Sequence, residues 1–349
     1  MKAQYRNECL DIMKAIACVF VVLIHCMFPG SLGVICRALA RFAVPFFFII
    51  SGYFLYDRDR KSANASIPRK VRHLLIIALL SGIGYFIIEI VQYIYMAFDS
   101  FRIWTFLQEK ISWELMLRFF LTNTPIVYSP RWFLYALVYC YFSIWLFHKT
   151  DVSYKWLYGA SGCLLLGHLL LEYSSFFLGN NVGFYIGNSD VYVTIRNLFI
   201  FRALPWFVLG LGIKEYEKLL KIRTPYCMIG ILFGIISTIV EVFLLGDASI
   251  YVGTLILVFF MFCIALNKGE QSFHSPINHI GRDLSLYVYI LHGAVISGFA
   301  FVERILKIEA GWFLWFKPLL VIFISILAAE MIYLLTEKIK VWRKKKNEL

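Results

Sequence analysis

Long apolar segments dominate this chain, and short polar segments separate them. Each apolar segment approaches the roughly 20 residues that a helix needs to cross a bilayer. The pattern predicts an all-α fold, a polytopic membrane helical bundle of about ten transmembrane helices. Phe and Tyr, with 33 and 21 residues, are expected to fill much of this bundle. The expected spans are residues 10–28, 38–56, 73–96, 131–147, 155–173, 198–214, 226–245, 250–267, 284–302 and 312–336.

Three polar segments between the spans stand out. Residues 57–73 form a strongly basic segment that is expected to be a loop. The stretch 97–130 contains SWELMLRFFL, whose mixture of large apolar and charged side chains predicts an interfacial amphipathic helix. The stretch 174–197 is rich in Gly and Asn and is expected to be a turn-rich outer loop, either a flexible lid or a connector.

The positive charge of the chain follows its expected topology. The net charge is +12, which by itself would also suit a nucleic-acid-binding protein. If the spans alternate from a cytoplasmic N-terminus, roughly two thirds of the Lys and Arg residues fall on the cytoplasmic side, as the positive-inside rule requires. We therefore expect a multi-pass protein of the cell membrane with both termini cytoplasmic and no nucleic-acid partner. Residues 1–340 form one transmembrane domain, and residues 341–349 form a basic cytoplasmic tail.

The eight cysteines do not indicate a redox or metal site. None is part of a C-x-x-C pair, and most fall within the expected spans. Cysteine inside a helical bundle usually behaves as a small apolar packing residue. We expect no disulfide framework and no bound metal.

Two polar residues in the first expected span point to function. Lys14 and His25 lie eleven residues apart in LDIMKAIACVFVVLIHCMF, and ionisable residues inside a span are costly and usually functional. On an ideal helix they share a face to within about 20°, but lie roughly 16 Å apart along the axis. They should therefore have separate roles. Asp11, on the same segment, is taken as a supporting residue.

A pair of arginines begins the third expected span. Ser66 and Pro68 resemble the start of a helix, with Ser66 as its cap. Arg69 and Arg72 would then share one helix face and could hold a phosphate or pyrophosphate group. The alternative is plain anchoring at the cytoplasmic membrane surface, which is common for such pairs.

Further polar side chains lie within or beside apolar runs. Ser51, close to Pro45 and Gly52, suits helix packing. Arg131 and Trp132 begin the fourth span, where interface anchoring is the alternative to a functional role. His292 lies inside the ninth span and is either a hydrogen-bonded packing residue or part of a site.

Arg202 is a second cation inside an apolar span. It stands shortly before Trp206 in RALPWFVLG, and an arginine there needs a partner or a wet cavity. The sequence leaves its counter-charge open among Glu89, Glu241 and Glu330.

Taken together, these segments resemble the acyltransferase-3 family of integral membrane acyltransferases. The resemblance covers nearly the whole chain in order, so the domain expected over 1–340 is acyltransferase-3-like. The first-span signature is a basic residue, ten residues and then His, and the second signature is R-x-x-R. The matching segments are LDIMKAIACVFVVLIHC (10–26), AVPFFFIISGYFL (43–55), RKVR (69–72), PRWFLYALV (130–138), RALPWFVLG (202–210) and LSLYVYILH (284–292).

The resemblance implies an O-acetyltransferase-like enzyme. Its co-substrate would be acetyl-CoA or another acyl-CoA, with no permanently bound cofactor. Its acceptor would be a hydroxyl of a cell-envelope carbohydrate or lipid-linked sugar. His25 would be the general base, Lys14 would assist catalysis or donor binding, and Arg69 with Arg72 would bind the donor. The supporting residues would be Asp11, Ser51, Arg131, Trp132, Arg202, Trp206 and His292.

Other functions remain compatible with the sequence. A transporter of a small polar solute or amino acid could use the same buried polar residues without acyl transfer. A non-catalytic membrane partner in an envelope assembly is the third reading. The acceptor, the acyl group, which of them crosses the membrane and the oligomeric state are not determined by the residues.

Overall fold

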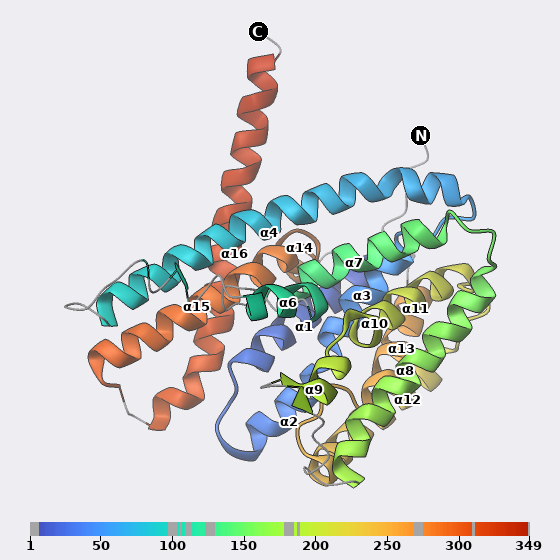
Figure 1. Ribbon diagram of the computed structural model, residues 1–349, viewed down its shortest axis with the longest axis horizontal. Coiled ribbons are helices and arrows are strands. Elements are labelled where there is room, and N and C mark those ends of the chain that lie inside the picture. Colours follow the sequence, from blue (N-terminus) through green and yellow to red (C-terminus); the bar gives the residue numbers. More distant parts are fainter. Residues whose placement is uncertain are drawn as a thin grey trace. The chain divides into compact units, whose positions relative to one another are not determined.

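The structure is a computed structural model that describes residues 7–96, 104, 107–108, 113–122, 130–177, 185–186, 189–268, 275–308 and 311–347 (Figure 1). These residues are helical apart from turns and a two-residue antiparallel hairpin of β1 (Tyr185–Ile186) and β2 (Ser189–Asp190). The predicted helical class is confirmed. The chain divides into two compact units. Unit 1 comprises Met1–Ala43, Lys221–Asp247 and Gly253–Leu349, and unit 2 comprises Val44–Leu220 and Ala248–Val252.

Unit 1 is built around α1 (Glu8–His25). The side chain of Asn7 caps this helix: its Oδ1 accepts a hydrogen bond from the Leu10 N–H (3.0 Å), and its Nδ2 donates to the Ala265 carbonyl (2.7 Å). Such a cap satisfies backbone N–H groups that a helix start leaves unpaired. Packed on α1 are α2 (Gly30–Ala40), η1 (Ile280–Leu284), α14 (Pro276–His279), α15 (Ser285–Leu306) and α16 (Gly311–Asn347); the unit also contains α12 (Thr224–Leu245) and α13 (Val252–Asn267).

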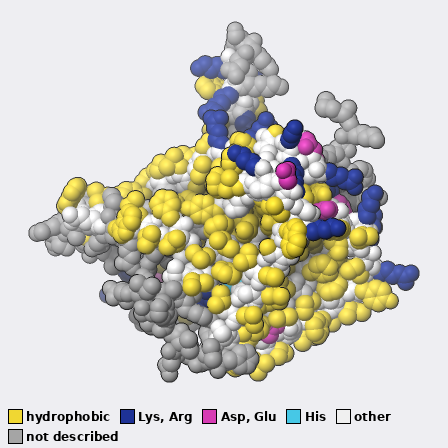
Figure 2. All heavy atoms as spheres, turned by 45° about the vertical axis from the view of Figure 1, so that its right-hand side comes forward, with side chains coloured by type: hydrophobic (Ala, Val, Ile, Leu, Met, Phe, Trp, Pro, Cys, Tyr) yellow, Lys and Arg dark blue, Asp and Glu magenta, His cyan; other side chains and the backbone are white. Residues whose placement is uncertain are grey.

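Helix α12 has one face that packs against a neighbouring helix and an opposite face that is exposed. Gly230, Gly234 and Thr238 follow one another at intervals of four and are buried. A Cβ on Gly234 would lie 2.7 Å from the Leu257 backbone nitrogen, so α13 packs directly against this glycine face. The opposite face exposes large apolar side chains, as does much of the molecular surface (Figure 2). Such a face suits lipid. Its residues are Tyr226, Met228, Ile229, Leu232, Phe233, Ile236, Val240, Phe243 and Leu244.

Unit 2 contains two principal helix pairs. The long helix α4 (Arg60–Met96) packs along α7 (Trp132–Phe147), and α8 (Tyr154–Phe177) packs on α11 (Leu204–Glu215) (Figure 1). The side chains of Phe48, Leu134, Trp206 and Phe207 are almost fully buried and form part of its core. The remaining helices are α3 (Ala43–Tyr53), α6 (Trp113–Thr122), α9 (Val191–Arg196) and α10 (Phe199–Arg202).

Two glycines bring α3 and α11 into backbone contact. A Cβ placed on Gly52 would lie 1.9 Å from the Phe207 carbonyl oxygen, and one on Gly210 would lie 2.0 Å from the Ile49 carbonyl oxygen. Neither position can hold a larger side chain unless the helices separate. The expected packing role of Gly52 is confirmed, and Gly210 is its counterpart. Small residues at helix contacts of this kind are typical of membrane bundles.

The expected count of ten transmembrane helices is not confirmed. Five helices among the described residues are long and apolar enough to cross a bilayer. Helix α1 carries Glu8, Asp11 and Lys14, α7 and α13 have only 16 residues each, and the expected span 198–214 is interrupted at Ala203 (φ −125°). The five are Gly30–Tyr53, Arg60–Tyr95, Thr224–Leu245, Pro276–Leu306 and Gly311–Arg343. The chain is therefore a helical protein with membrane-spanning character.

The predictions that residues 57–73 form a loop and that Ser66 caps the next helix were wrong. Helix α4 begins at Arg60, so most of the segment expected to be a basic loop is helical. Pro68 lies inside this helix, and Ser66 does not cap it but donates from Oγ to the Ala63 carbonyl (2.8 Å). Helix α16 continues to Asn347, so the first seven residues of the expected tail are a continuation of a helix. The helix expected within 97–130 is present as α6, with Trp113, Met116 and Phe120 exposed.

The contact between α3 and α11 can be tested with one added methyl group. We expect Gly210→Ala to lower the unfolding temperature in detergent by about 5 °C or more, because overpacking a close contact costs on the order of 1–3 kcal/mol. Gly159→Ala, in α8, is the matched control, because nothing lies within 4 Å of its added Cβ. Alanine also favours a helix over glycine, so this control should be neutral or slightly stabilising. Equal unfolding temperatures for the two variants would contradict the packing assignment.

Candidate active site

Lys14 is paired within its own helix. Its Nζ lies 2.6 Å from Oδ1 of Asp11, one turn earlier in α1. The Asp11 residue is 3% exposed, and the Lys14 side chain is 17% exposed. An ion pair in so little water needs close geometry to offset the loss of hydration. The supporting role expected for Asp11 therefore has a physical basis, since it supplies the charge that Lys14 requires.

His25 lies beside a second histidine. The ring centroids of His25 and His292 are 5.2 Å apart, with 36° between the ring planes. His25 is the last residue of α1 and is exposed, whereas His292 on α15 is completely buried. The sequence placed both residues in apolar segments, and the structure brings them together inside unit 1. Lys14 lies about three helical turns before His25 on α1, so the two residues are far apart along this helix, as expected.

The protonation pattern of His292 can be read from its contacts. Its Nδ1 lies 3.2 Å from the Val288 carbonyl oxygen. A carbonyl only accepts hydrogen bonds, so Nδ1 carries the hydrogen and Nε2 of the neutral ring is the acceptor. This Nε2 is buried and has no hydrogen-bond partner among the described residues. A buried imidazole nitrogen with a free lone pair therefore lies in the same region as His25.

A π-helical turn holds α15 against α1. In η1, a Cβ on Gly281 would lie 1.7 Å from the Asp11 carbonyl oxygen and 2.9 Å from the Ala15 nitrogen. Single π turns are uncommon and often occur at functional sites. A little further along, the Cys18 thiol donates to the Ser285 carbonyl (3.7 Å). These contacts fix the alignment of α1 and α15, and with it the approach of the two histidines.

Arg69 and Arg72 are both exposed on α4 in unit 2. Neither has a hydrogen-bond or ion-pair partner among the described residues. Lys70, between them, turns inward: its Nζ lies 3.4 Å from the Phe54 carbonyl oxygen and 5.6 Å from the centre of the Tyr141 ring. The pair thus presents two guanidinium groups outside the unit's core, as either phosphate binding or surface anchoring requires.

Arg131 lies in the core of unit 2. It is 2% exposed, its Nη1 donates to the Ala78 carbonyl (3.0 Å), and its guanidinium lies 5.4 Å from the centre of the Tyr85 ring. A Cβ on Gly82 would come within 2.6 Å of this Nη1, so glycine makes room for the guanidinium. Interface anchoring needs a side chain that reaches the membrane surface, and this buried one does not.

Arg202 and Trp132 form a second cation–aromatic pair. The Arg202 guanidinium lies 3.9 Å from the centre of the Trp132 ring, and its Nη1 donates to Asn197 Oδ1 (3.3 Å). Both side chains are half-buried, and a contact of this kind stabilises by roughly 0.5 to 2 kcal/mol. Of the glutamates considered as its counter-charge, Glu330 accepts from His279 (2.7 Å) within unit 1. This contact with an aromatic ring was not expected from the sequence.

Ser51 and Trp206 have packing roles in the structure. Ser51 donates from Oγ to the Phe47 carbonyl (2.8 Å), one turn back in α3. Trp206 is 1% exposed in the core of unit 2. Ser51 is half-buried and Trp206 is buried, and both belong to the scaffold of this unit.

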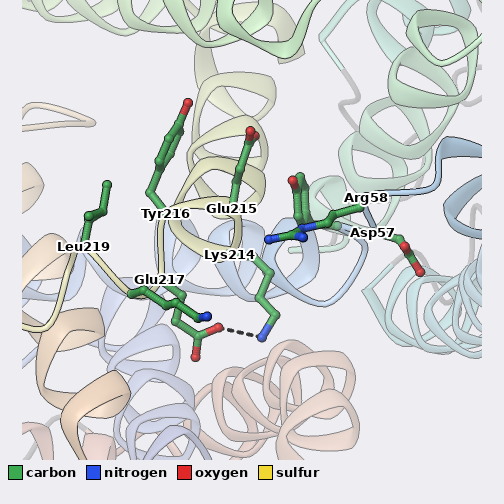
Figure 3. Close-up of a pocket in the computed structure, with 9 residues that line it drawn as sticks. Asp57, Arg58, Lys214, Glu215, Tyr216, Glu217 and Leu219 are labelled. Carbon is green, nitrogen blue, oxygen red and sulfur yellow. Dashed lines mark hydrogen bonds and ion pairs between the residues drawn. The ribbon is translucent and has the colours of Figure 1, made fainter.

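A half-open cavity at the end of α11 was not anticipated from the sequence. Its volume is about 360 Å³, and its lining combines residues that precede α4 with residues that end α11 (Figure 3). The only sequence signal for it is the run KEYEKL, where charged and aromatic residues alternate after an apolar span. The lining residues are Tyr56, Asp57, Arg58, Lys214, Glu215, Tyr216, Glu217, Lys218 and Leu219.

A neutral histidine ties α7 to the start of α4. His148 Nδ1 lies 2.8 Å from Asn64 Oδ1, so it donates, and Nε2 accepts from the Tyr154 hydroxyl (2.7 Å). Arg60 holds the same corner by donating to the Thr150 (2.7 Å) and Val152 (2.6 Å) carbonyls. Burial and the nearby Arg60 charge lower the pKa of His148 to about 4.

Comparison with known proteins defines the class. The family model described as an acyltransferase domain matches residues 7–334. The chain therefore belongs to the acyltransferase-3 family, as its motifs predicted, and that membership supports a membrane transferase. Among the described residues, no group of three or more His, Cys, Asp and Glu side chains could hold a metal ion.

A curated relative matches over most of this chain. The chain is 27% identical over 323 residues to a serine/alanine racemase of Enterococcus gallinarum. The match covers 87% of this chain but 43% of that protein, so the chain spans less than half the length of this relative. No solved structure matches the chain.

The His148 contacts predict a pH dependence of stability. The folded protein holds this pKa at about 4, against an ordinary value of 6.5. The unfolded chain therefore takes up a proton first as the pH falls, and the stabilisation present above pH 6.5 is lost progressively towards pH 4. We expect His148→Gln, which does not titrate, to flatten the fall in unfolding temperature over this range. The measurement is thermal unfolding from pH 7.5 to 4.5, and identical pH slopes would contradict the assignment.

Proposed function

We propose that this protein transfers an acyl group, acetyl in the simplest case, from acyl-CoA to a hydroxyl of a cell-envelope carbohydrate or lipid-linked sugar. The observation that carries the proposal is the pair of His25 and His292 in a family of acyltransferases. Imidazole suits proton transfer near neutral pH because its ordinary pKa is about 6.5.

His25 is the general base in this proposal. It removes the proton of the acceptor hydroxyl as the oxygen attacks the thioester carbonyl of the donor. A carbon–oxygen bond forms, the carbon–sulfur bond breaks, and the proton passes to the leaving thiolate to give coenzyme A. His25 is the exposed member of the pair, which an acceptor can reach, and His292 is the buried member.

His292 positions this base. Its ring is fixed by the Val288 carbonyl, and its Nε2 lone pair faces a buried environment. The ring of His292, 5.2 Å from that of His25 between centroids, limits how the His25 ring can turn and so helps to hold its base nitrogen in place. Second groups that orient a catalytic histidine recur in acyl transfer.

Lys14 and Asp11 act at a distance from the reacting carbonyl. The ion pair is anchored at the start of α1, where η1 packs against it. We assign Lys14 to donor binding or to lining the path to His25. In the absence of substrate, the charge of Lys14 is balanced by Asp11.

Arg69 and Arg72 are the candidate donor clamp. Two exposed guanidinium groups on one helix can bind the pyrophosphate of coenzyme A through several charge-assisted hydrogen bonds. The same exposure suits an anionic membrane surface. Donor binding is proposed because the family is one of acyltransferases.

The catalytic role of His25 has a direct test. We expect His25→Ala to reduce acetyl transfer or donor turnover by about 10²-fold or more, in line with loss of a general base. His292→Asn should keep part of the activity and move the pH optimum, because it alters a neighbour of the base. The assay uses purified protein with acetyl-CoA, and circular dichroism controls for folding. Wild-type transfer by His25→Ala would remove the proposal, and no donor turnover by the wild-type protein would favour transport instead.

The donor clamp is tested separately. Arg69→Gln with Arg72→Gln is expected to weaken coenzyme A binding by about tenfold or more, since each lost charged hydrogen bond is worth about 1.5 kcal/mol. Binding is measured by isothermal titration calorimetry in detergent. Lys61→Gln, exposed on the same helix, is the matched control. Unchanged coenzyme A affinity would leave only the membrane-anchoring role for the pair.

A further inference from the structure

In the cavity at the end of α11, the carboxylates have hydrogen-bond partners within the fold, whereas some of the cations have none in the part of the chain that the structure describes. Its lining contains three cations and three carboxylates. Each carboxylate already has a partner in the fold. Glu217 accepts from Lys214 Nζ (2.7 Å) and the Tyr53 hydroxyl (3.0 Å), Glu215 accepts from the Tyr158 hydroxyl, and Asp57 accepts from the Asp59 N–H (3.0 Å).

Two of the three cations make no hydrogen bond or ion pair within the described part of the chain. Arg58 and Lys218 line the cavity and have no hydrogen-bond or ion-pair partner among the described residues. Arg58 extends towards Lys214, and the Asp57 carboxylate points the other way (Figure 3). Among the charged groups of the cavity, those without a partner in the described part of the chain are therefore cations, although its formal charges cancel.

Aromatic surface accompanies these cations. Tyr56 and Tyr216 both line the cavity, and Tyr216 is 38% exposed. Tyr216 and Glu215 leave the end of α11 in the same direction (Figure 3). A ring face beside a carboxylate acceptor can stack with a purine and accept from its exocyclic amine. Free cations nearby suit a phosphate group.

We propose that this cavity binds the 3′-phosphorylated adenosine end of the acyl-CoA donor, with Arg58 and Lys218 on the phosphate and Tyr216 on the adenine. This inference rests on the proposed function. A volume of about 360 Å³ is at the lower end of small-molecule sites and fits one end of a long cofactor. In the alternating topology expected from the sequence, both lining segments face the cytoplasm, where acyl-CoA is found.

The 3′-phosphate provides a test that isolates this cavity. We expect the wild-type protein to have a KM for acetyl-CoA about tenfold lower than for 3′-dephospho-acetyl-CoA. In Arg58→Gln with Lys218→Gln, the two KM values should differ by about twofold or less, with kcat unchanged. Tyr216→Leu should instead raise both KM values by a similar factor. A wild-type protein that does not distinguish the two donors, or a double variant that still does, would overturn the proposal.

Matched controls separate the cavity from general surface charge. Lys61→Gln with Lys155→Gln removes two exposed cations of the same unit that do not line the cavity, and it should keep the preference for the 3′-phosphate. Nanodiscs of neutral and of anionic lipid distinguish a nucleotide phosphate from a lipid headgroup. If Arg58→Gln with Lys218→Gln changes KM only in anionic discs, the two cations bind lipid and the proposal fails.

Binding without turnover distinguishes this inference from the proposed function. Adenosine 3′,5′-bisphosphate is titrated into wild-type protein and the double variant by calorimetry. If no acyl transfer is found but the bisphosphate binds wild type about tenfold more tightly than the variant, the cavity assignment stands and the acyltransferase proposal fails. If transfer is found and the bisphosphate binds both proteins equally, the reverse holds.

Discussion

The contact between Gly281 and the α1 backbone is the constraint on which the rest of unit 1 depends. The π turn η1 lies so close to α1 that even a Cβ would overlap the Asp11 carbonyl oxygen, at 1.7 Å. This contact sets how α15 runs along α1, and so it sets the 5.2 Å between the rings of His25 and His292. The same segment of α1 carries the Asp11–Lys14 pair. One close backbone contact therefore positions both polar elements of the candidate active site.

Buried and half-buried cations in this protein are balanced locally and by different means. Lys14 has a carboxylate, Arg202 has an indole ring, and Arg131 has a carbonyl, a tyrosine ring and the space that Gly82 leaves. Each arrangement replaces part of the hydration that a cation loses in an apolar interior. By contrast, Arg69 and Arg72 remain exposed. Cations that are already satisfied support the fold, whereas exposed ones remain available to a phosphate or to lipid.

The candidate donor-binding residues and the candidate base lie in different chemical environments. Arg58, Lys218, Arg69 and Arg72 in unit 2 offer unoccupied positive charge, which suits a phosphorylated cofactor. The histidine pair in unit 1 offers imidazole nitrogens in a mostly apolar setting, which suits proton transfer. The first environment suits the binding part of the proposed reaction, and the second suits its proton transfer.

The sequence by itself determined the helical class and the family, because hydrophobic patterning and short motifs are local properties. A helix over the fourth expected segment, 131–147, is present almost residue for residue as α7, although α7 is shorter than the five helices that are long enough to cross a bilayer. Pro68 misled the prediction of α4, since tertiary packing tolerates a proline inside a long helix. Only the tertiary structure decided that Arg131 is buried, that Trp132 faces Arg202, that His292 lies beside His25, and that a cavity forms at the end of α11. These facts depend on contacts between residues far apart in the chain, which periodicity along one segment does not encode.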